Sequence, residues 1–320
     1  MADLRAPFPW FGGKSRAAAL IWEALGDVPN FVEPFAGSLA VLLGRPHAPR
    51  TETVNDLDCY VSNLWRALAA DPDAVAHHAD WPVNEADLSA RHQWLVNQAA
   101  FRERMATDPD YHDAKIAGWW VWGQCLWIGS GWCDLRGELP VGDVGRGVHR
   151  KLPHVGDAGQ GVHRQLPHVS NAGQGGTLDY LRGLAARLRR VRVACGEWDR
   201  VLGDSVTWRH GLTGVVLDPP YRDGGLDYGA GGVGTDLSAR VAAWAIEAGQ
   251  RADMRVILCS YEGEHDMPAS WRCVPWKARG GYGSTRADGT NANAGRERLW
   301  LSPACHDPTR QASLFGAARG

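Results

Sequence analysis

Short apolar runs alternate with amphipathic segments over the first seventy or so residues and again after about residue 178. Strands are predicted where Val, Ile or Leu gather ahead of a turn, over 30–35, 53–54, 191–195, 213–217 and 255–259. Helices are predicted between them, over 17–25, 39–43, 60–69, 178–188 and 237–248. Two more strands, over 272–276 and 297–301, are expected to close the sheet. This alternation is typical of an α/β domain with a mostly parallel sheet.

The middle of the chain departs from this alternation. Residues 88–105 keep a helical period without a breaker, which predicts one helix. Five of the chain's sixteen tryptophans lie within 119–133, and core packing is the expected role of most, because each ring buries a large area. Residues 145–158 are then repeated as 159–172, with ten of fourteen positions identical. Two copies are too few for a solenoid, and their glycines and prolines exclude long helices.

Composition sets broad limits on the kind of protein. With 320 residues, 44% hydrophobic and 22% charged, the chain is expected to fold as an ordinary globular protein. No apolar run reaches the roughly eighteen residues that span a bilayer, and the N-terminus lacks a signal-peptide pattern. Seven cysteines without a CxxC pair suit a reducing cytosol. Cys125, Cys133 and the histidines of the repeat match no zinc-ligand spacing, so we predict no metal site.

The strand predicted over 213–217 ends in Asp218-Pro219-Pro220-Tyr221. In an open α/β sheet, ligands collect at the carboxyl ends of the strands. Asp218 and the carbonyl of Pro219 are acceptors that suit the exocyclic amine of a planar base, and Tyr221 can stack on its ring. The two prolines donate nothing and fix the backbone, so the acceptors are aimed before the base arrives.

Two further motifs come earlier in the chain. Residues 31–37, Phe-Val-Glu-Pro-Phe-Ala-Gly, form a strand-to-turn junction whose glycine lets the backbone approach a ligand closely. Residues 9–14 read Pro-Trp-Phe-Gly-Gly-Lys. Along the chain, residues 9–14 come first, residues 31–37 second and Asp-Pro-Pro-Tyr last. The three motifs in this order resemble the Dam-type (D12 class) DNA adenine-N6 methyltransferases. The resemblance implies an α/β fold: the doubly wound, Rossmann-like sheet of S-adenosylmethionine-dependent methyltransferases, with an inserted DNA-recognition region.

The resemblance also implies where S-adenosylmethionine binds. The implied cofactor residues are Trp10, Gly12, Gly13, Lys14, Glu33, Phe35, Ala36, Gly37, Asp56, Glu197, Trp198 and Asp218. Glu197-Trp198 stands where the family has Asp-Phe, and Ser38-Leu39 stands where it continues with more glycine. Asp56 follows a strand, where an acid can bind ribose hydroxyls, but it also suits the N-cap of the next helix. Core packing is the alternative for Trp10, while Lys14 would bind the cofactor carboxylate or hold the catalytic loop.

The inserted region is expected between two parts of the methyltransferase core. We place the core at 1–79 and 191–302, the target-recognition region at 80–190, and a flexible tail at 303–320. This order puts recognition between the cofactor motifs and the catalytic motif, which suits a cleft with DNA between two lobes.

A basic stripe falls inside this region. Between 136 and 192 there are ten Lys and Arg against four Asp and Glu, although the whole chain has a net charge of −2. Such a stripe suits phosphate contacts, and a solvated helix face explains its 182–190 part equally well. The candidate DNA-binding residues are Arg146, Arg150, Lys151 and Arg164. A duplicated flexible linker is the alternative for the repeat, and exposed rings of 119–133 would stack on bases.

These motifs together predict a site-specific DNA adenine-N6 methyltransferase that flips its target adenine out of the duplex. A cytosine-N4 or RNA amino-methyltransferase, or a related base-hypermodifying transferase, would use the same acceptors. A DNA-binding protein with an inactive methylase core belongs to another class, and an intact Asp218 to Tyr221 argues against it. The expected partners are double-stranded DNA and a cognate restriction endonuclease, in the cytoplasm or at the nucleoid. The sequence leaves the oligomeric state and the recognition sequence open.

Replacing Arg150 and Arg164 together by alanine is predicted to weaken DNA binding and to flatten its salt dependence, because fewer phosphate contacts release fewer counterions. DNA affinity measured over a series of salt concentrations tests this. Unchanged binding would support the linker interpretation of the repeat.

Overall fold

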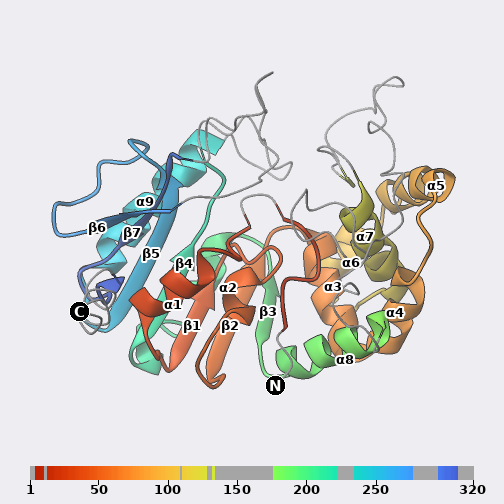
Figure 1. Ribbon diagram of the computed structural model, residues 1–320, viewed down its shortest axis with the longest axis horizontal. Coiled ribbons are helices and arrows are strands. Elements are labelled where there is room, and N and C mark those ends of the chain that lie inside the picture. Colours follow the sequence, from red (N-terminus) through yellow and green to blue (C-terminus); the bar gives the residue numbers. More distant parts are fainter. Residues whose placement is uncertain are drawn as a thin grey trace, which may run out of the picture. The chain divides into compact units, whose positions relative to one another are not determined.

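The computed structural model describes residues 4–10, 13–108, 110–127, 132–133, 176–221, 234–276 and 295–308. The chain divides into two compact units, Met1–Gly13 with Asp56–Glu197, and Lys14–Asn55 with Trp198–Gly320. We call the first the helical unit and the second the sheet unit, after the elements that dominate each (Figure 1). The tandem repeat, with Arg146, Arg150, Lys151 and Arg164, lies outside the described residues.

The sheet unit is built on parallel strands with one reversed strand near an edge. Its strands are β1 (Asn30–Glu33), β2 (Thr51–Asp56), β4 (Thr213–Leu217), β5 (Met254–Tyr261), β6 (Arg272–Pro275) and β7 (Glu297–Leu301). Their order is β2-β1-β4-β5-β7-β6. β2, β1, β4 and β5 run parallel, whereas β7 is antiparallel to β5 and to β6. All the strands predicted for this unit are present, extended or shortened by a few residues.

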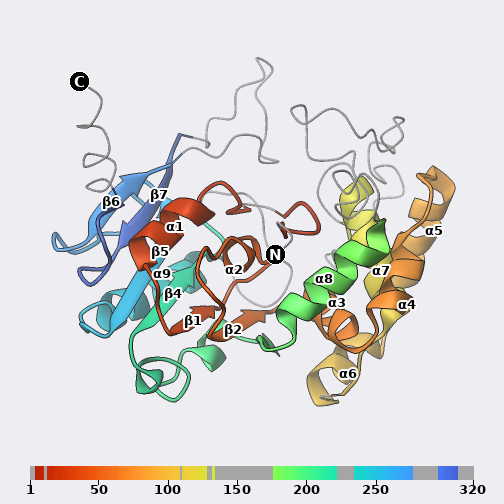
Figure 2. The same ribbon diagram turned by 60° about the horizontal axis from the view of Figure 1, so that its bottom comes forward.

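Helices cover this sheet on both faces. α1 (Ala18–Leu25) and α2 (Ala40–Leu43) lie on one face, and α9 (Gly234–Ala248) lies on the other (Figures 1 and 2). β1 and β4 are buried along their whole length, as expected for central strands covered from both sides. The α/β, Rossmann-like methyltransferase fold predicted from the sequence is confirmed.

The direction of winding reverses between β1 and β4. From β1 the chain moves outward to β2, and from β4 it moves outward to β5 on the other side. β1 and β4 are parallel neighbours with Val32 opposite Val215, so the segments that follow them leave at the same edge. A crevice forms at such a reversal, outside the carboxyl ends of the strands, and ligands bind there in doubly wound folds.

The helical unit packs around one apolar helix. It contains α3 (Cys59–Ala70), α4 (Pro72–Ala79), α5 (Glu85–Val96), α6 (Phe101–Thr107), α7 (Ala114–Leu126), α8 (Thr177–Leu188) and β3 (Arg192–Cys195). In and after α7, Trp120, Trp122, Trp127 and Trp132 are buried, which confirms core packing for most of this tryptophan segment. Within the described part of the chain, no helix is long and apolar enough to cross a membrane.

The single helix predicted over 88–105 is wrong, because the chain breaks it into α5 and α6. The side-chain amides of Asn97 and Gln98 donate to the carbonyl oxygens of Gln93 and Trp94, at 2.7 and 2.8 Å. Side chains that bond to nearby backbone in this way compete with helix continuation. The polar residues at the break fall where a continuous helix would have polar positions, so the pattern of apolar and polar residues gave no sign of the turn.

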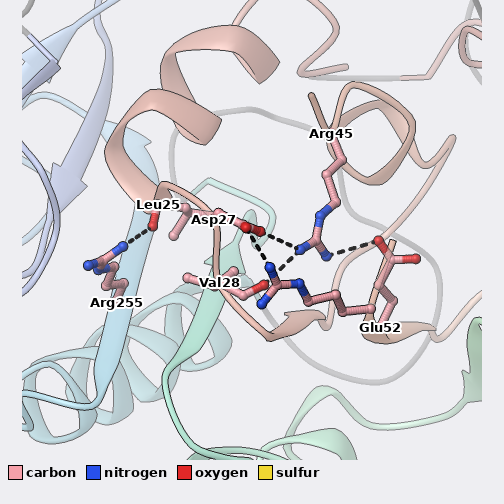
Figure 3. A network of polar contacts seen from close by, with 7 residues as sticks. Leu25, Asp27, Val28, Arg45, Glu52 and Arg255 are labelled. Carbon is pink, nitrogen blue, oxygen red and sulfur yellow. Dashed lines mark hydrogen bonds and ion pairs between the residues drawn. The ribbon is translucent and has the colours of Figure 1, made fainter. Parts of the chain in front are cut away.

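A buried ion pair stabilises the sheet unit at the edge where β1 and β2 begin (Figure 3). The Arg45 guanidinium lies 3.1 Å from Glu52 Oε1 and donates to the Val28 carbonyl oxygen at 2.7 Å. Both side chains of the Arg45–Glu52 pair are 1% exposed. Arg50 also binds Asp27 in this network, but these two side chains are 50% and 40% exposed.

Arg45→Met is predicted to lower the free energy of unfolding by about 3–5 kcal/mol, because it leaves the Glu52 carboxylate buried without its cation. Arg50→Met, the matched exposed control, is expected to cost at most about 1 kcal/mol. Urea unfolding measures both. The double variant Arg45→Met with Glu52→Leu should recover part of the loss, since no charge is then left buried. Equal losses for Arg45→Met and Arg50→Met would contradict this role.

Candidate active site

The segment after β4 presents its polar groups at the carboxyl edge of the sheet. Asp218 is half-buried and Pro219 is buried. The Tyr221 hydroxyl donates to Asp218 Oδ1 at 3.1 Å. Burial, reinforced by the nearby Asp218 carboxylate, raises the pKa of Tyr221 well above its ordinary value, so the phenol keeps the proton that it donates. The four predicted catalytic residues therefore stand at the carboxyl end of β4, where the winding reverses.

Lys14 binds this segment from the start of the sheet unit. Its ammonium nitrogen lies 2.7 Å from each carboxylate oxygen of Asp218. It also lies 5.5 Å from the ring centres of Tyr221 and Trp276, over their faces. Burial by itself would lower the pKa of Lys14, but the charge of Asp218, the other acidic groups nearby and the hydrogen bond to Asp218 together outweigh it, and the pKa is raised. Lys14 is therefore a buried ammonium ion that holds the catalytic segment.

β5 and β7 form a wall beside this ion pair. The Tyr261 ring packs edge-on against Tyr221, with 4.6 Å between the ring centres. Glu297, the first residue of β7, is paired with Tyr261 in the antiparallel register. Burial raises the pKa of Glu297 to about 7. Burial also raises the pKa of Cys259, so this thiol stays protonated and is no nucleophile at neutral pH.

A second group of predicted residues follows β1. Glu33 is buried at the end of the strand. The Ala36 N–H donates to the Asn55 carbonyl oxygen at 2.9 Å, which fixes the turn against the end of β2. The Phe35 ring stacks on Trp198, with 6.2 Å between ring centres and 19° between the planes. Predicted cofactor residues from two distant segments of the sheet unit are thus in contact.

The turn itself needs two left-handed residues. Gly37 has φ +44°, and Leu39 has φ +60° although it has a side chain. Leu39 is fully buried at the N-cap position of α2. The sequence departs from the family's glycines here, and the structure shows the consequence: an ordinary residue held in a conformation that glycine adopts freely.

The remaining predicted cofactor residues belong to the helical unit. Trp10 packs on Phe8 and Trp120, with ring centres 5.6 and 6.2 Å away, as the core-packing alternative expects. Gly13 donates its N–H to the Trp10 carbonyl oxygen at 3.0 Å, and Gly12 lies outside the described residues.

Asp56 is the last residue of β2, and Glu197 comes two residues after the end of β3. Both residues belong to the helical unit. Asp56 Oδ1 accepts from the N–H of Asp58 at 2.8 Å, and Asp58, not Asp56, caps α3. The N–H of Gly196 donates to the Asp56 carbonyl oxygen at 3.2 Å, so the two ends are joined, and the next residue, Glu197, is exposed. The cofactor roles of these residues remain predictions.

Sequence reasoning did not find the wall of the site. Tyr261, Trp276, Cys259 and Glu297 carry no motif. Cys259 and Tyr261 lie near Asp218 because β5 is the parallel neighbour of β4, and Glu297 joins them because β7 runs antiparallel next to β5. One signal was available for Glu297: a carboxylate begins a strand whose other residues are mostly apolar.

Comparison with known families agrees with this geometry. Residues 10–107 match the model of a family described as D12 class N6 adenine-specific DNA methyltransferase. That stretch is therefore similar to the D12 class. The match contains the motifs around Lys14 and Gly37, and it ends before Asp218. A search of curated proteins found no match.

The D12 match confirms the predicted resemblance and the activity that it implied, DNA adenine-N6 methylation by a methyltransferase. It does not favour the cytosine, RNA or inactive alternatives. Enzymes of this kind use S-adenosylmethionine in general, and the family's substrate is DNA.

The left-handed turn after β1 leads to a stability prediction at Leu39. Leu39→Ala and Leu39→Gly both lose the buried side chain, but alanine also keeps the strain of a positive φ. We expect the glycine variant to be the more stable of the two, by up to about 1 kcal/mol. At Leu64, buried within α3, the order should reverse, since glycine costs about 1 kcal/mol in a helix. Thermal unfolding of the four variants tests both orders, and the same order at both positions would contradict the strained turn.

Proposed function

We propose that the chain methylates N6 of a specific, flipped adenine in double-stranded DNA, with Asp218 to Tyr221 as the segment that binds the base. One observation supports this most: the buried Lys14–Asp218 pair joins the family-matched N-terminal motif to a segment outside the match. The two motifs that the sequence predicted to act together are therefore in direct contact within the sheet unit.

Each residue of the segment has a proposed part in holding adenine. The N6 amine would donate one proton to Asp218 and one to the Pro219 carbonyl oxygen. Tyr221 would stack on the ring, as aromatic side chains do with flipped bases. Its own hydroxyl already binds Asp218, which sets the carboxylate orientation before the base enters. Such preorganised acceptors are worth several kcal/mol of barrier, because they need no rearrangement during the reaction.

In the proposed reaction, the protein mainly positions the two reactants and stabilises the charge that develops. When bound, S-adenosylmethionine supplies a sulfonium methyl group: the N6 lone pair forms the new N–C bond while the C–S electrons leave with sulfur, giving S-adenosylhomocysteine. Hydrogen bonds to Asp218 and Pro219 favour a pyramidal nitrogen with an available lone pair. Asp218 then accepts the proton that the methylated nitrogen loses.

The residues after β1 fit a nucleoside cofactor. The turn at Gly37 brings backbone close to the crevice, and Phe35 and Trp198 provide a stacked aromatic pair. The buried indole N–H of Trp198 has no acceptor among the described residues, so a ligand that offers one would satisfy it. Glu33 adds a buried carboxylate that suits a cationic donor. We propose that these residues hold S-adenosylmethionine.

DNA recognition remains a proposal for the region predicted at 80–190. In α8 of this region, Arg182 binds Asp73 of α4 with two hydrogen bonds, at 2.8 and 2.6 Å. This arginine is therefore engaged within the helical unit, which leaves the rest of the basic stripe as the candidate for phosphate contacts. We also propose that the protein acts in the cytoplasm, at the nucleoid, and that a cognate restriction endonuclease is its partner.

The deciding experiment is mass spectrometry of nucleosides from DNA incubated with the protein and labelled S-adenosylmethionine. Labelled N6-methyladenine is expected, and sequencing of the methylated positions would then give the recognition site. Label on cytosine would move the target base. DNA without label, with the cofactor still bound, would contradict the proposal and point to RNA or to a different donor group.

Asp218→Ala is predicted to lower the single-turnover rate of methyl transfer by about a thousandfold or more, because N6 loses its charged acceptor. Binding of S-adenosylmethionine, measured by calorimetry, should change little. Asp253→Ala is the matched control: it removes an exposed aspartate, paired with Arg251, immediately before β5. A variant of Asp218 that still turns over at the wild-type rate would refute its catalytic role.

A further inference from the structure

The Lys14–Asp218 pair creates a problem for the proposed reaction. Lys14 contacts both carboxylate oxygens of Asp218, and Tyr221 donates to one of them. An ammonium ion in that position neutralises the carboxylate and weakens it as an acceptor for the N6 amine. Asp218 would accept most strongly if Lys14 moved to another anion when adenine bound.

A second carboxylate lies on the wall beside this pair, on β7 opposite Tyr261. Glu297 is 7% exposed, and its Oε2 has no hydrogen-bond partner among the described residues. It interacts electrostatically with both Lys14 and Asp218. The backbone N–H of Trp276 donates to the Glu297 carbonyl oxygen at 3.4 Å. The ring of the same tryptophan lies under Lys14. An acid buried in this way without a full set of partners calls for an explanation.

We propose that Glu297 is the alternative partner of Lys14: the ammonium ion moves from Asp218 to Glu297 as the target base enters, which frees Asp218 to bind N6. Glu297 is thus a positioning residue that acts through Lys14 and touches neither substrate. This inference rests on the proposed function of Asp218 to Tyr221 as the base-binding segment.

The geometry keeps the exchange local. Lys14 lies over the faces of Tyr221 and Trp276, at 5.5 Å from each ring centre, and aromatic faces attract a cation. The ammonium ion can therefore shift within an aromatic cradle without entering water. Because two carboxylates serve one ammonium ion, only one of them is fully compensated at a time.

The exchange should depend on pH, because Glu297 accepts Lys14 best when it is ionised. The pKa of Glu297, raised to about 7, means that protonation below neutral pH removes this partner and favours the resting pair. Among the described residues, the charged and titratable groups around it are Lys14, Asp218, Tyr221, Cys259 and Tyr261. The pKa values of Lys14 and the two tyrosines are raised, and so is that of the thiol, which puts their titration above this range.

The test is single-turnover methyl transfer to DNA across pH 6–8.5, with labelled S-adenosylmethionine. In the wild type, the rate should rise through about pH 7. Glu297→Gln, of the same shape but without charge, should lower the rate at pH 8 by about 10- to 100-fold and abolish this rise. Its affinity for S-adenosylmethionine should stay within about threefold of the wild type. Glu297→Asp should restore part of the rate and of the pH dependence.

A double-variant cycle separates exchange from a merely structural role. In a Lys14→Met background there is no ammonium ion to move, so adding Glu297→Gln should change the rate less than about threefold. Glu262→Gln is the matched control and should behave as the wild type, because it removes the charge of an exposed glutamate immediately after β5.

The outcomes distinguish the two proposals. If the wild type methylates adenine but Glu297→Gln keeps its rate and pH profile, the exchange is refuted and the proposed function stands. The same holds if Glu297→Gln lowers the rate equally with and without Lys14. If the wild type transfers no methyl group to DNA, the proposed function fails, and the exchange fails with it.

Discussion

The buried ion pair between Lys14 and Asp218 is the contact on which the site depends. It spans 204 positions of sequence and joins the start of the sheet unit to the segment after β4. Lys14 is nearly inaccessible, so its ammonium ion needs an anion within the protein, and Asp218 provides one in direct contact. The pair therefore holds the two segments together while the site is empty. A pair of this kind suits a site whose acceptor must be aimed before the base arrives.

The pair can form only because of the sheet's topology. Parallel strands deliver their carboxyl ends to one edge, and the reversal between β1 and β4 opens that edge to ligands. β7 adds the unusual element. Because it runs against β5, its first residue, rather than its last, reaches the same edge beside Tyr261. A single reversed strand thus brings Glu297 to a site otherwise made of parallel strand ends.

Much of this could be predicted from the sequence, for a physical reason. Central strands are short apolar runs and motifs stand at their ends, so β1, β4 and the Asp218 segment could be placed without a structure. Local pattern fails where partners are distant: it does not say that β7 inserts between β5 and β6, and so it missed Glu297. It also fails where polar side chains mimic a helical surface, as at Asn97 and Gln98. The positive φ of Leu39 is likewise a property of the folded turn, and residue propensities do not predict it.

Charge balance explains why a second carboxylate would belong in this site. A lysine paired with one aspartate is neutral, and it offers nothing to the positive charge that methyl transfer moves from sulfur to nitrogen. With Glu297 ionised, the three side chains together carry one net negative charge, which under the proposed function would stabilise that positive charge. The burial that raises the pKa of Glu297 also keeps the field of this charge from being screened by water. The same low polarity that makes the extra carboxylate costly to bury makes it effective in the reaction.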